Sequence, residues 1–525
     1  MTSSLDAALA LAGSLVAAVI SYAAWSFLLH PLAGVPGPLR ARLGLGGWAT
    51  VRAAKRDFGW ELAALHDRYG DFVRIGRNDV SVVAPQAVHD LYKYGGQVKN
   101  KSPFYQFFKV TKPSLLATLS HDEHALARRS VSPAFSMHLL VELEEFVDAC
   151  FDDLSAQLES QISKGGGKTT VDMGDLLQFV AMDVVGELAF GRSFGLTKAG
   201  YDTSEFLPML DAYTASSCLS GTQPWARTVL HWWLTRRLGS SGNAALGQKA
   251  SQAVALRLDE LKQAQETGDA DSIRRDILSK LIAAKNPDGS PFSIEQVKVQ
   301  ANSVLGAGSD TTSITFRALV AYIVADPAVY KKVMDEIELS LEEGIIQFPL
   351  SHAAGSKLAY FQACLKETLR LHPAVPWVLP RVVPQGGAVV AGRFFSAGVH
   401  IGMSPFVFQR RAEAYGPDAQ VFRPERWLEA SDDEKKVLER NLLTFGAGNR
   451  VCVGKNVALM ELTKLGPSLL YRFKLSFTPR SPSSPHKLPG RTVDGKVGDA
   501  APWFCESQWF AHQREFFCDV EERAV

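Results

Sequence analysis

One short segment near the C-terminal end places a cysteine among glycines, an arginine and an aromatic residue. Residues 445–454 read FGAGNRVCVG, with the thiol at Cys452. A thiolate that binds a metal needs a tight loop and nearby backbone N–H groups, and glycines allow both. Residues 455–469 have helical period, and a helix N-terminus would stabilise negative sulfur. A lone cysteine is more often a small buried hydrophobe, but this spacing favours a metal-bound thiolate. Arg450 is placed to pair with a cofactor carboxylate.

A second candidate site is the segment AGSDTT, residues 307–312, in the middle of a predicted long helix. A helical glycine costs about 1 kcal/mol, and Asp and Thr are also poor helix formers. Gly306 and Gly308 remove side chains on either side of Ala307, so a flat cofactor and a substrate can approach. Thr311 can donate back to the carbonyl of Ala307 and open a groove. Close packing against a neighbouring helix explains the glycines equally well if Cys452 is left aside.

The elements that carry these residues are mainly helical in period. The long helix is predicted from Ser293, which forms a capping box with Gln296, to about Ala325. Another helix stops before Pro373 and holds Glu367 and Arg370, which taken alone predict a surface ion pair of a few tenths of a kcal/mol. The remaining predictions are a helical apolar stripe over 176–188, a β-hairpin over 74–83, and strands at 473–477 and around 509–510.

Composition limits the class of protein. The chain has 525 residues, and its 56 Lys and Arg against 55 Asp and Glu give no excess charge for nucleic acid. Six scattered cysteines suit a reducing compartment and argue against a disulfide scaffold. No break in composition suggests a second domain. We therefore expect one large, mainly helical unit with minor β structure over residues 41–525.

The N-terminus predicts a membrane anchor within residues 1–30. Residues 7–29 are uncharged and long enough, as a helix, to cross a hydrocarbon core of about 30 Å. A cleaved signal peptide is the rival interpretation, but the leader lacks a positive charge and the apolar run is too long. The first basic residues, Arg40 and Arg42, place the body in the cytosol. Residues 31–40 predict a stiff Pro/Gly-rich linker, and the sequon at Asn100 is expected to stay unmodified.

The pattern Phe-x-x-Gly-x-Arg-x-Cys-x-Gly over 445–454 matches the haem-binding signature of the cytochrome P450 family at every fixed position, Gly454 included. The resemblance implies a single cytochrome P450 domain that binds haem b. By this resemblance Cys452 is the axial iron ligand, Arg450 contacts a haem propionate, and Phe445 packs beside the sulfur. Thiolate ligation favours O–O cleavage. Segment 307–312 looks like the family's oxygen-binding groove beside Ala307, with Asp310 and Thr311 as an acid–alcohol pair that delivers protons.

The same resemblance assigns further residues. It joins Glu367 and Arg370 to Arg426 in a buried triad that supports the haem loop. His124-Ala-Leu-Ala-Arg128 resembles the family's Trp-x-x-x-Arg element, whose side chains meet the propionates, with histidine in place of tryptophan. Arg381 matches another propionate-binding arginine.

The resemblance extends over nearly the whole chain. Residues 183–191 and 392–398 look like fungal members, particularly the pisatin demethylase-like group, whereas the polar stretch 481–501 departs from the pattern and is read as a surface loop. The pocket of such a protein is expected to involve residues 100–119, Val304, Leu305, Ala307 and Thr312. Residues 375–379, with Trp377 and Val378, are expected to add an apolar and aromatic side.

The function that follows is insertion of one atom of O2 into a small apolar organic substrate, in fungal specialised metabolite biosynthesis or xenobiotic oxidation. Electrons are expected from NADPH through a separate cytochrome P450 reductase, with cytochrome b5 as a further donor, in the endoplasmic reticulum membrane. The basic residues 435, 436, 440 and 455 form a candidate docking face, for which an ordinary solvated surface is an equal explanation. The alternatives are a haem-thiolate isomerase, dehydratase or peroxygenase, and a non-enzymatic haem sensor or carrier.

Overall fold

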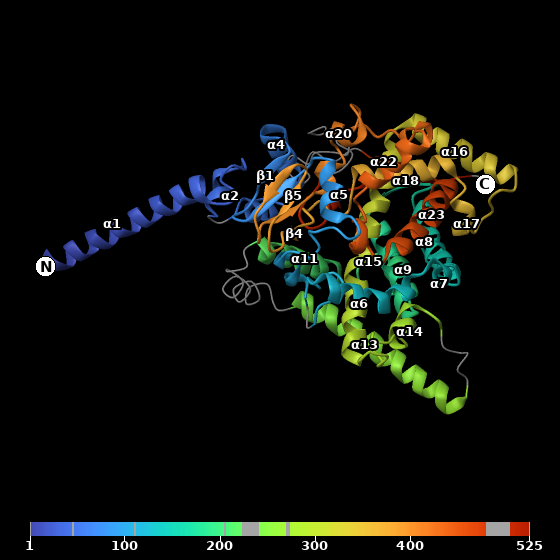
Figure 1. Ribbon diagram of the computed structural model, residues 1–525. Helices are drawn as coiled ribbons and strands as arrows, with labels where there is room; N and C mark the ends of the chain where they lie inside the picture. Colours follow the sequence, from blue (N-terminus) through green and yellow to red (C-terminus); the bar gives the residue numbers. More distant parts are fainter. Residues whose placement is uncertain are drawn as a thin grey trace.

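A helix of 32 residues, α15 (Ile294–Ala325), lies at the centre of the protein (Figure 1). Ser293 Oγ accepts a hydrogen bond from the Gln296 N–H at 3.2 Å, and Gln296 Oε1 accepts one from the Ser293 N–H at 2.9 Å. The predicted capping box is therefore confirmed. Asp326 ends α15 and caps α16 (Pro327–Glu342) by accepting from the Ala328 N–H at 2.9 Å.

The computed structural model describes residues 2–44, 47–109, 112–203, 206–222, 241–268, 274–478 and 504–523. These residues form a mainly helical body with small sheets, which confirms the predicted fold class; the stretch 481–501 lies outside them. Helices not described elsewhere in the text are α2 (Leu39–Leu43), α3 (Trp48–Lys55), α4 (Phe58–Tyr69), α5 (Gln86–Tyr92), α6 (His121–Val131), α7 (Met137–Val141), α8 (Glu144–Lys164), α10 (Leu196–Ala199), α11 (Phe206–Thr222), α13 (Ser241–Thr267), α14 (Ile277–Ile282), α17 (His352–Gly355), α19 (Pro405–Phe408), α20 (Ala412–Tyr415) and α21 (Arg426–Glu429), with 3-10 turns at Pro103–Phe108, Ser132–Phe135 and Gly448–Arg450.

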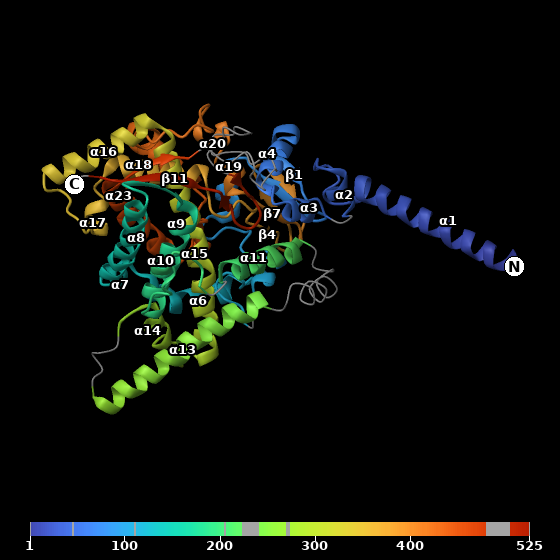
Figure 2. The same cartoon turned by 180° about the vertical axis from the view of Figure 1, so that it is seen from behind.

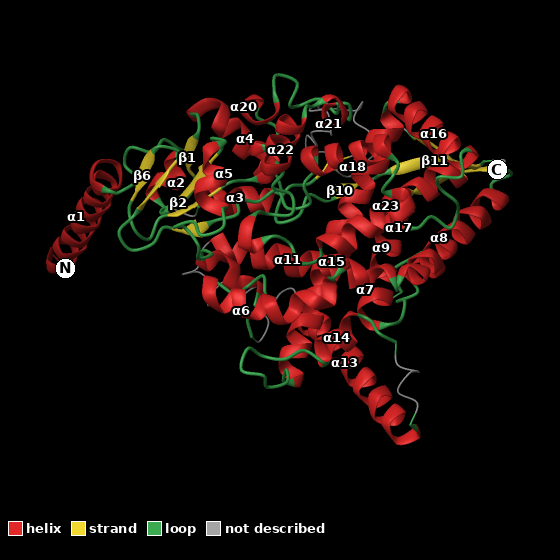
Figure 3. Ribbon diagram, turned by 45° about the vertical axis from the view of Figure 1, so that its right-hand side comes forward, coloured by secondary structure: helices red, strands yellow, loops and turns green. Residues whose placement is uncertain are grey.

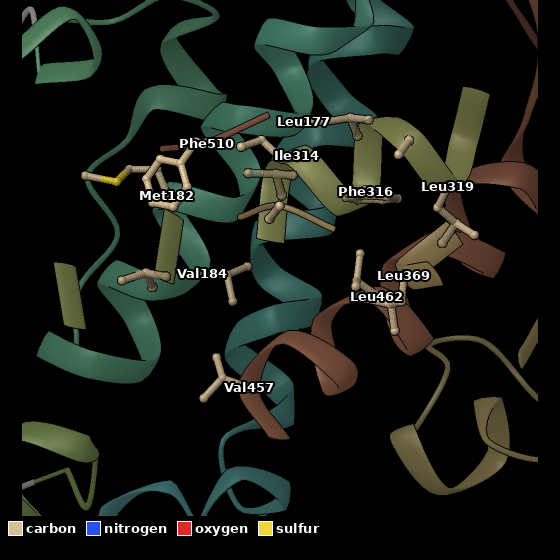
Figure 4. Packing of buried hydrophobic residues seen from close by; sticks show 14 of the residues in the cluster. Leu177, Met182, Val184, Ile314, Phe316, Leu319, Leu369, Val457, Leu462 and Phe510 are labelled. Carbon is tan, nitrogen blue, oxygen red and sulfur yellow. The ribbon is translucent and has the colours of Figure 1, made fainter. Parts of the chain in front are cut away.

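Helices α9 (Met173–Phe190) and α23 (Lys455–Arg472) pack on α15 and form the main hydrophobic core. Figure 4 shows side chains from the three helices together, among them Leu177, Ile314 and Leu462. Burying each such side chain stabilises the fold by about 1.5–3 kcal/mol. A Cβ atom at Gly308 would lie 2.8 Å from Val185 Cγ2, so this glycine lets α15 approach α9 closely. Gly308 thus serves close helix packing, and it also lines the cavity described below, so the two interpretations do not exclude each other.

The strands form small separate sheets, most of them at the end of the body next to α1 (Figure 3). Strands β1 (Phe72–Arg74) and β2 (Asp79–Val82) make the predicted hairpin, and the order of their sheet is β1-β2-β7-β4, with β7 at His400–Gly402 and β4 at Arg381–Val382. β5 (Ala388–Val390) pairs with β6 (Arg393–Phe395). At the other end, β11 (Phe517–Glu522) lies between β3 (Lys168–Asp172) and β8 (Phe473–Phe477), near α8 and α9 (Figure 2). The predicted strand at 473–477 is confirmed.

The prediction of a strand around Trp509 and Phe510 is wrong. These residues form the turn between β9 (Phe504–Cys505) and β10 (Gln513–Arg514). β9 and β10 pair with each other, an isolated bridge joins Ser507 to Asp57, and the turn itself enters the body of the protein. Both aromatic rings are buried there.

An apolar N-terminal helix, α1 (Thr2–Ala24), projects from the body (Figure 1) and continues as a π-helical turn over Trp25–Leu29. Among the described residues, one helix, Asp6–Leu29, is long and apolar enough to cross a membrane, and its most apolar part is not buried against the protein. This is compatible with a membrane anchor. Leu32 and Val35 of the following segment are buried, and the Arg74 N–H donates to the Pro36 carbonyl at 2.7 Å. The connection is therefore packed against β1.

Candidate active site

Cys452 lies in a tight loop directly before α23, the cysteine loop of residues 445–454. Its N–H donates to the Phe445 carbonyl at 2.8 Å, which closes the loop. Gly446 and Gly448 have φ angles of 72° and 61°, and a Cβ at Gly448 would lie 1.8 Å from the Tyr92 carbonyl oxygen. Glycine is therefore required at position 448 by both conformation and space.

The sulfur of Cys452 is exposed, but to an internal cavity. Burial in the protein raises the pKa of its thiol, while the Gly454 N–H, the Arg128 charge and the Lys455 N–H act in the opposite direction. These two N–H groups start α23, as predicted for a helix that stabilises negative sulfur. Within the described ranges no group of three or more His, Cys, Asp or Glu side chains could hold a metal ion. A single thiolate ligand is the arrangement in which a macrocycle holds iron and supplies the other ligands.

The cavity beside Cys452 has about 1810 Å³ of empty space, open solvent at its mouth included. It brings together the predicted cofactor-binding residues His124, Arg128, Ala307, Arg381, Phe445, Arg450, Cys452 and Gly454. No carboxylate is found among the described residues that line it, although Lys101 adds another cation. Lys101 was not singled out in the sequence, because an isolated lysine carries no motif.

The cations on this side of the cavity lack an anionic partner. Arg450 donates to the carbonyls of residues 118–120 at 2.8–3.0 Å, and its buried Nε has no partner among the described residues. Burial, with Arg381 nearby, lowers the pKa of Arg450 to about 10. Lys101 donates to the Leu116 carbonyl at 2.7 Å, and burial together with Arg381 and Arg450 holds its pKa well below the usual range. Carbonyls satisfy these donors without neutralising them, so the site suits a ligand with more than one carboxylate.

His124 lies at the same side of the cavity and is buried. Its burial, followed by the charges of Arg450, Lys101 and Arg128, lowers its pKa to about 3. A neutral imidazole at neutral pH can still donate one hydrogen bond to a ligand carboxylate. Arg128 itself donates to the Val451 carbonyl and so ties α6 to the cysteine loop.

Across the cavity from the cysteine loop lies the middle of α15. Thr311 faces the cavity and its Oγ1 donates to the Ala307 carbonyl at 2.7 Å, as predicted. Asp310 does not line the cavity. Its Oδ1 accepts from Gln178 Nε2 at 2.8 Å, and burial, opposed mainly by the Arg317 charge, raises its pKa to about 7. The two members of the predicted acid–alcohol pair are thus adjacent in sequence but face different sides of the helix.

Glu367, Arg370 and Arg426 form a cluster beneath the cysteine loop. Glu367 Oε1 lies 2.7 Å from Arg370 Nη2 and 3.4 Å from Arg426 Nε, and Oε2 accepts from Trp427 Nε1 at 2.9 Å. Glu367 and Arg370 are fully buried on α18 (Ala359–Leu371). The interpretation of this pair as an exposed one, taken from its spacing alone, is therefore wrong.

Gln409 connects this cluster to the cysteine loop. Its Nε2 donates to the Arg370 carbonyl at 2.7 Å, and its Oε1 accepts from the Leu443 N–H at 2.6 Å, two residues before Phe445. The side chain is fully buried. The sequence around it carries no motif, and only the folded chain shows that it spans these two segments.

The aromatic side of the cavity comes from the turn between β9 and β10, residues 506–512, called here the tail turn. Trp509 and Phe510 line it, with Val375 and Leu379 beside them, whereas Trp377, Val378 and Leu305 do not. Trp377 instead stacks on Phe58 with ring centroids 3.6 Å apart. The expected lining role of Trp377, Val378 and Leu305 is therefore wrong, because these side chains point into the hydrophobic core.

Comparison with known proteins agrees with this geometry. The chain matches the cytochrome P450 family over residues 36–493. It is 32% identical over 481 residues to the cytochrome P450 monooxygenase gsfF of Penicillium aethiopicum, covering 89% of this chain and 92% of that protein. It is 30% identical over 445 residues to pisatin demethylase of Fusarium vanettenii, covering 84% of each. The chain belongs to the cytochrome P450 family.

Members of this family are haem enzymes that use O2, and the chain is accordingly a haem monooxygenase. The residues present fit that cofactor: a single cysteine lies in a glycine loop, and cations without counter-ions line the same cavity. When bound, thiolate-ligated haem supplies the activation of O2.

Proposed function

We propose that this protein inserts one atom of O2 into a small apolar organic molecule held between α15 and the tail turn. The observation that supports this most directly is that Cys452, the cations without counter-ions and Thr311 face one cavity. Cys452 is proposed as the axial ligand of haem b, and Phe445 and Gly454 shape the space around its sulfur. Arg128, Arg381 and Arg450, with His124, would bind the two propionates.

The substrate class follows from the rest of the cavity. Among its described lining residues the charged side chains are all cations, whereas Val304, Val375, Trp509 and Phe510 present apolar and aromatic surface. Such a lining favours an apolar, partly aromatic substrate over a charged metabolite. One relative is named for the demethylation of pisatin and others only as monooxygenases. Fungal specialised metabolism or xenobiotic oxidation is the proposed setting.

Thr311 and Asp310 are proposed to supply the protons consumed when the second oxygen atom is reduced to water. Thr311 Oγ1 is at the cavity, and its hydrogen bond to the Ala307 carbonyl fixes its orientation. Asp310, with a pKa of about 7, holds an exchangeable proton at neutral pH on the other side of the same helix turn. Rotation of its side chain would bring that proton toward the cavity.

Electrons are proposed to come from NADPH through a separate, membrane-bound cytochrome P450 reductase, with cytochrome b5 as a further donor. The setting proposed is the endoplasmic reticulum membrane, with α1 as the anchor and the body in the cytosol. Lys455 is the best placed basic residue, since it lies beside the cysteine loop with Nζ 5.8 Å from the Phe445 ring centroid. Lys435, Lys436 and Arg440 lie on α22 (Asp432–Asn441), which also carries acidic residues, so their contribution to a docking face is smaller.

The proposed docking of the reductase at Lys455 is tested by Lys455→Glu. We expect a slower reductase-driven reduction at low salt, with Lys262→Glu on the exposed side of α13 as the matched control. Equal rates for the two variants would remove Lys455 from the docking surface.

The assignment of Cys452 is tested by the carbon monoxide difference spectrum of the reduced protein. The intact chain should show the strongly red-shifted Soret band of a thiolate-ligated ferrous haem, and Cys452→Ser should bind haem without that band. Cys518→Ala, which removes a buried thiol of β11, is the control and should keep it. A folded, haem-loaded wild-type protein without the band would refute thiolate ligation. Consumption of NADPH and O2 with reductase then separates a monooxygenase from an isomerase, a peroxygenase or a haem sensor.

A further inference from the structure

The tail turn places a histidine between two carboxylates. His512 directly precedes β10, and its Nε2 lies 3.9 Å from Asp310 Oδ2 and 3.8 Å from Asp211 Oδ1. The side chain is buried, and Nε2 has no hydrogen-bond partner among the described residues. Both distances exceed that of a hydrogen bond, so a small movement of the ring toward either carboxylate completes one contact or the other. A buried polar atom in this position requires an explanation.

The two carboxylates differ in their access to solvent. Asp310 is buried in α15 and bonded to Gln178, whereas Asp211 of α11 is about a quarter exposed. Arg56 holds Asp211 through both carboxylate oxygens at 2.9 and 3.1 Å, and Arg514 lies 3.5 Å from it. His512 thus lies between an acid at the surface and an acid behind the cavity.

We propose that His512 is a proton relay that recharges Asp310 from the solvent side through Asp211. This rests on the proposed function, in which Asp310 loses a proton at each turnover. Each transfer in the relay moves a single proton. A proton taken from solvent by Asp211 Oδ1 passes to the free Nε2 of a neutral His512 that carries its own hydrogen on Nδ1. The resulting imidazolium passes its Nε2 proton to the ionised Asp310 Oδ2, and the neutral ring is restored.

The surrounding charges give the relay its direction. Burial raises the pKa of Asp211, but the hydrogen bond from Arg56 and the charges of His512, Arg56 and Arg514 outweigh this effect and lower it, so Asp211 passes a proton on and does not keep it. The charged and titratable groups that face His512 are Asp310, Arg317, Asp211, Arg56, Arg514 and, through Arg56 and Arg514, Glu506. Burial and the Arg514 charge lower the pKa of His512 to about 3, so the ring is neutral at pH 7. Loss of the Asp310 proton places a second negative charge 3.9 Å from Nε2 and favours the imidazolium. His512 therefore takes up a proton while Asp310 is ionised and passes it to Asp310, after which the neutral ring is again favoured.

The relay is tested by hydrogen exchange at Asp310 in the full-length, haem-loaded protein. Infrared difference spectroscopy after transfer into D2O follows the protonated carboxyl band, which is assigned by its loss in Asp310→Asn. We expect His512→Phe and Asp211→Asn to slow this exchange by about tenfold or more. His66→Gln is the control, since it removes another buried imidazole that bonds Gly70 and Ser81 away from the cavity. Exchange in His512→Phe as fast as in the wild type overturns the proposal.

A second variant separates a relay from a merely positioning role. A glutamine side chain can hydrogen bond to Asp310 but cannot take up and release a proton as imidazole does. If His512 relays protons, His512→Gln stays slow, and a larger share of NADPH electrons ends in hydrogen peroxide instead of product. If His512 only positions Asp310, His512→Gln restores wild-type exchange and overturns the proposal. His512→Gln also decides the question if His512→Phe fails to fold. The thiolate carbon monoxide band and product formation of the wild type test the proposed function separately.

Discussion

Replacing Glu367 by glutamine should destabilise the protein far more than its small size suggests. The carboxylate is fully buried and accepts from Arg370 at 2.7 and 2.9 Å, from the Arg423 N–H at 3.0 Å and from Trp427 Nε1 at 2.9 Å. An amide at this position turns one acceptor into a donor that faces other donors, and it leaves the buried Arg370 and Arg426 without their shared anion. Breaking a buried ion pair from one side costs about 3–5 kcal/mol.

The matched control is the neighbouring exposed pair Lys366–Glu439. Its atoms are 2.9 Å apart, much like the buried pair, but the two side chains are 44% and 57% exposed. Glu439→Gln should therefore cost only about 0.2–1 kcal/mol. The comparison isolates burial, because the chemical change and the ion-pair distance are nearly the same.

The assay is urea unfolding of both variants, followed by circular dichroism and by loss of the thiolate carbon monoxide band. In Glu367→Gln the band should be lost at lower urea than in the control, because Gln409 transmits disorder of α18 to the cysteine loop. A Glu367→Gln protein within about 1 kcal/mol of Glu439→Gln would refute the reasoning, and would mean that the arginines find sufficient partners in backbone carbonyls.

Three further outcomes follow from the structure. Glu461 of α23 is buried, and neither of its carboxylate oxygens has a partner among the described residues, so burial raises its pKa well above the usual value. The stability that Glu461 contributes is present below the pKa of an unfolded carboxyl and is lost as pH rises through the raised folded pKa. Glu461→Gln should therefore have a higher urea midpoint than the wild type at pH 8 and a lower one at pH 5. Equal midpoints of the two proteins at both pH values would contradict this prediction. Thr311→Val should bind haem and substrate normally but lose about tenfold or more in the ratio of product to NADPH consumed, with peroxide formed instead; unchanged coupling would exclude its hydroxyl from proton delivery. Arg450→Leu should weaken haem binding, measured by haem titration, and should leave the haem-free protein at least as stable as the wild type, measured by unfolding. A destabilised haem-free variant would mean that the hydrogen bonds of Arg450 to the carbonyls of residues 118–120 stabilise the fold by more than burial of its charge destabilises it.

The features that the sequence predicted correctly are those fixed by local chemistry. The capping box at Ser293, the hairpin of β1 and β2, and the helix after Cys452 depend on residues a few positions apart, and the structure confirms each. The cysteine loop belongs to the same class, because its glycines and arginine lie within ten residues. The residues drawn from the family signature also gather at one cavity, although their roles in binding haem stay a prediction.

The errors arose where contacts join distant segments. Trp377 was expected at the cavity from the family resemblance, but its ring stacks in the core on Phe58, more than three hundred residues away in the sequence. Trp509 and Phe510 were expected in a strand, whereas only the pairing of β9 with β10 shows that they form a turn. Gln409 and His512 have no motif at all. Each becomes recognisable only through atoms supplied by other elements, such as Asp211 of α11.

The cations around Cys452 link stability to function. A fold that buries Lys101 and Arg450 beside carbonyls, with no carboxylate on the described cavity lining, is less stable than one with apolar residues there. That loss is recovered only when an anionic ligand enters, since a ligand that binds the folded state alone stabilises it in proportion to its affinity. Arg450 and Arg128 also hold the segments 118–120 and the cysteine loop together. If the propionates of haem bind these cations, as proposed, cofactor binding would relieve the buried charge and strengthen the contacts that hold Cys452 across the cavity from α15.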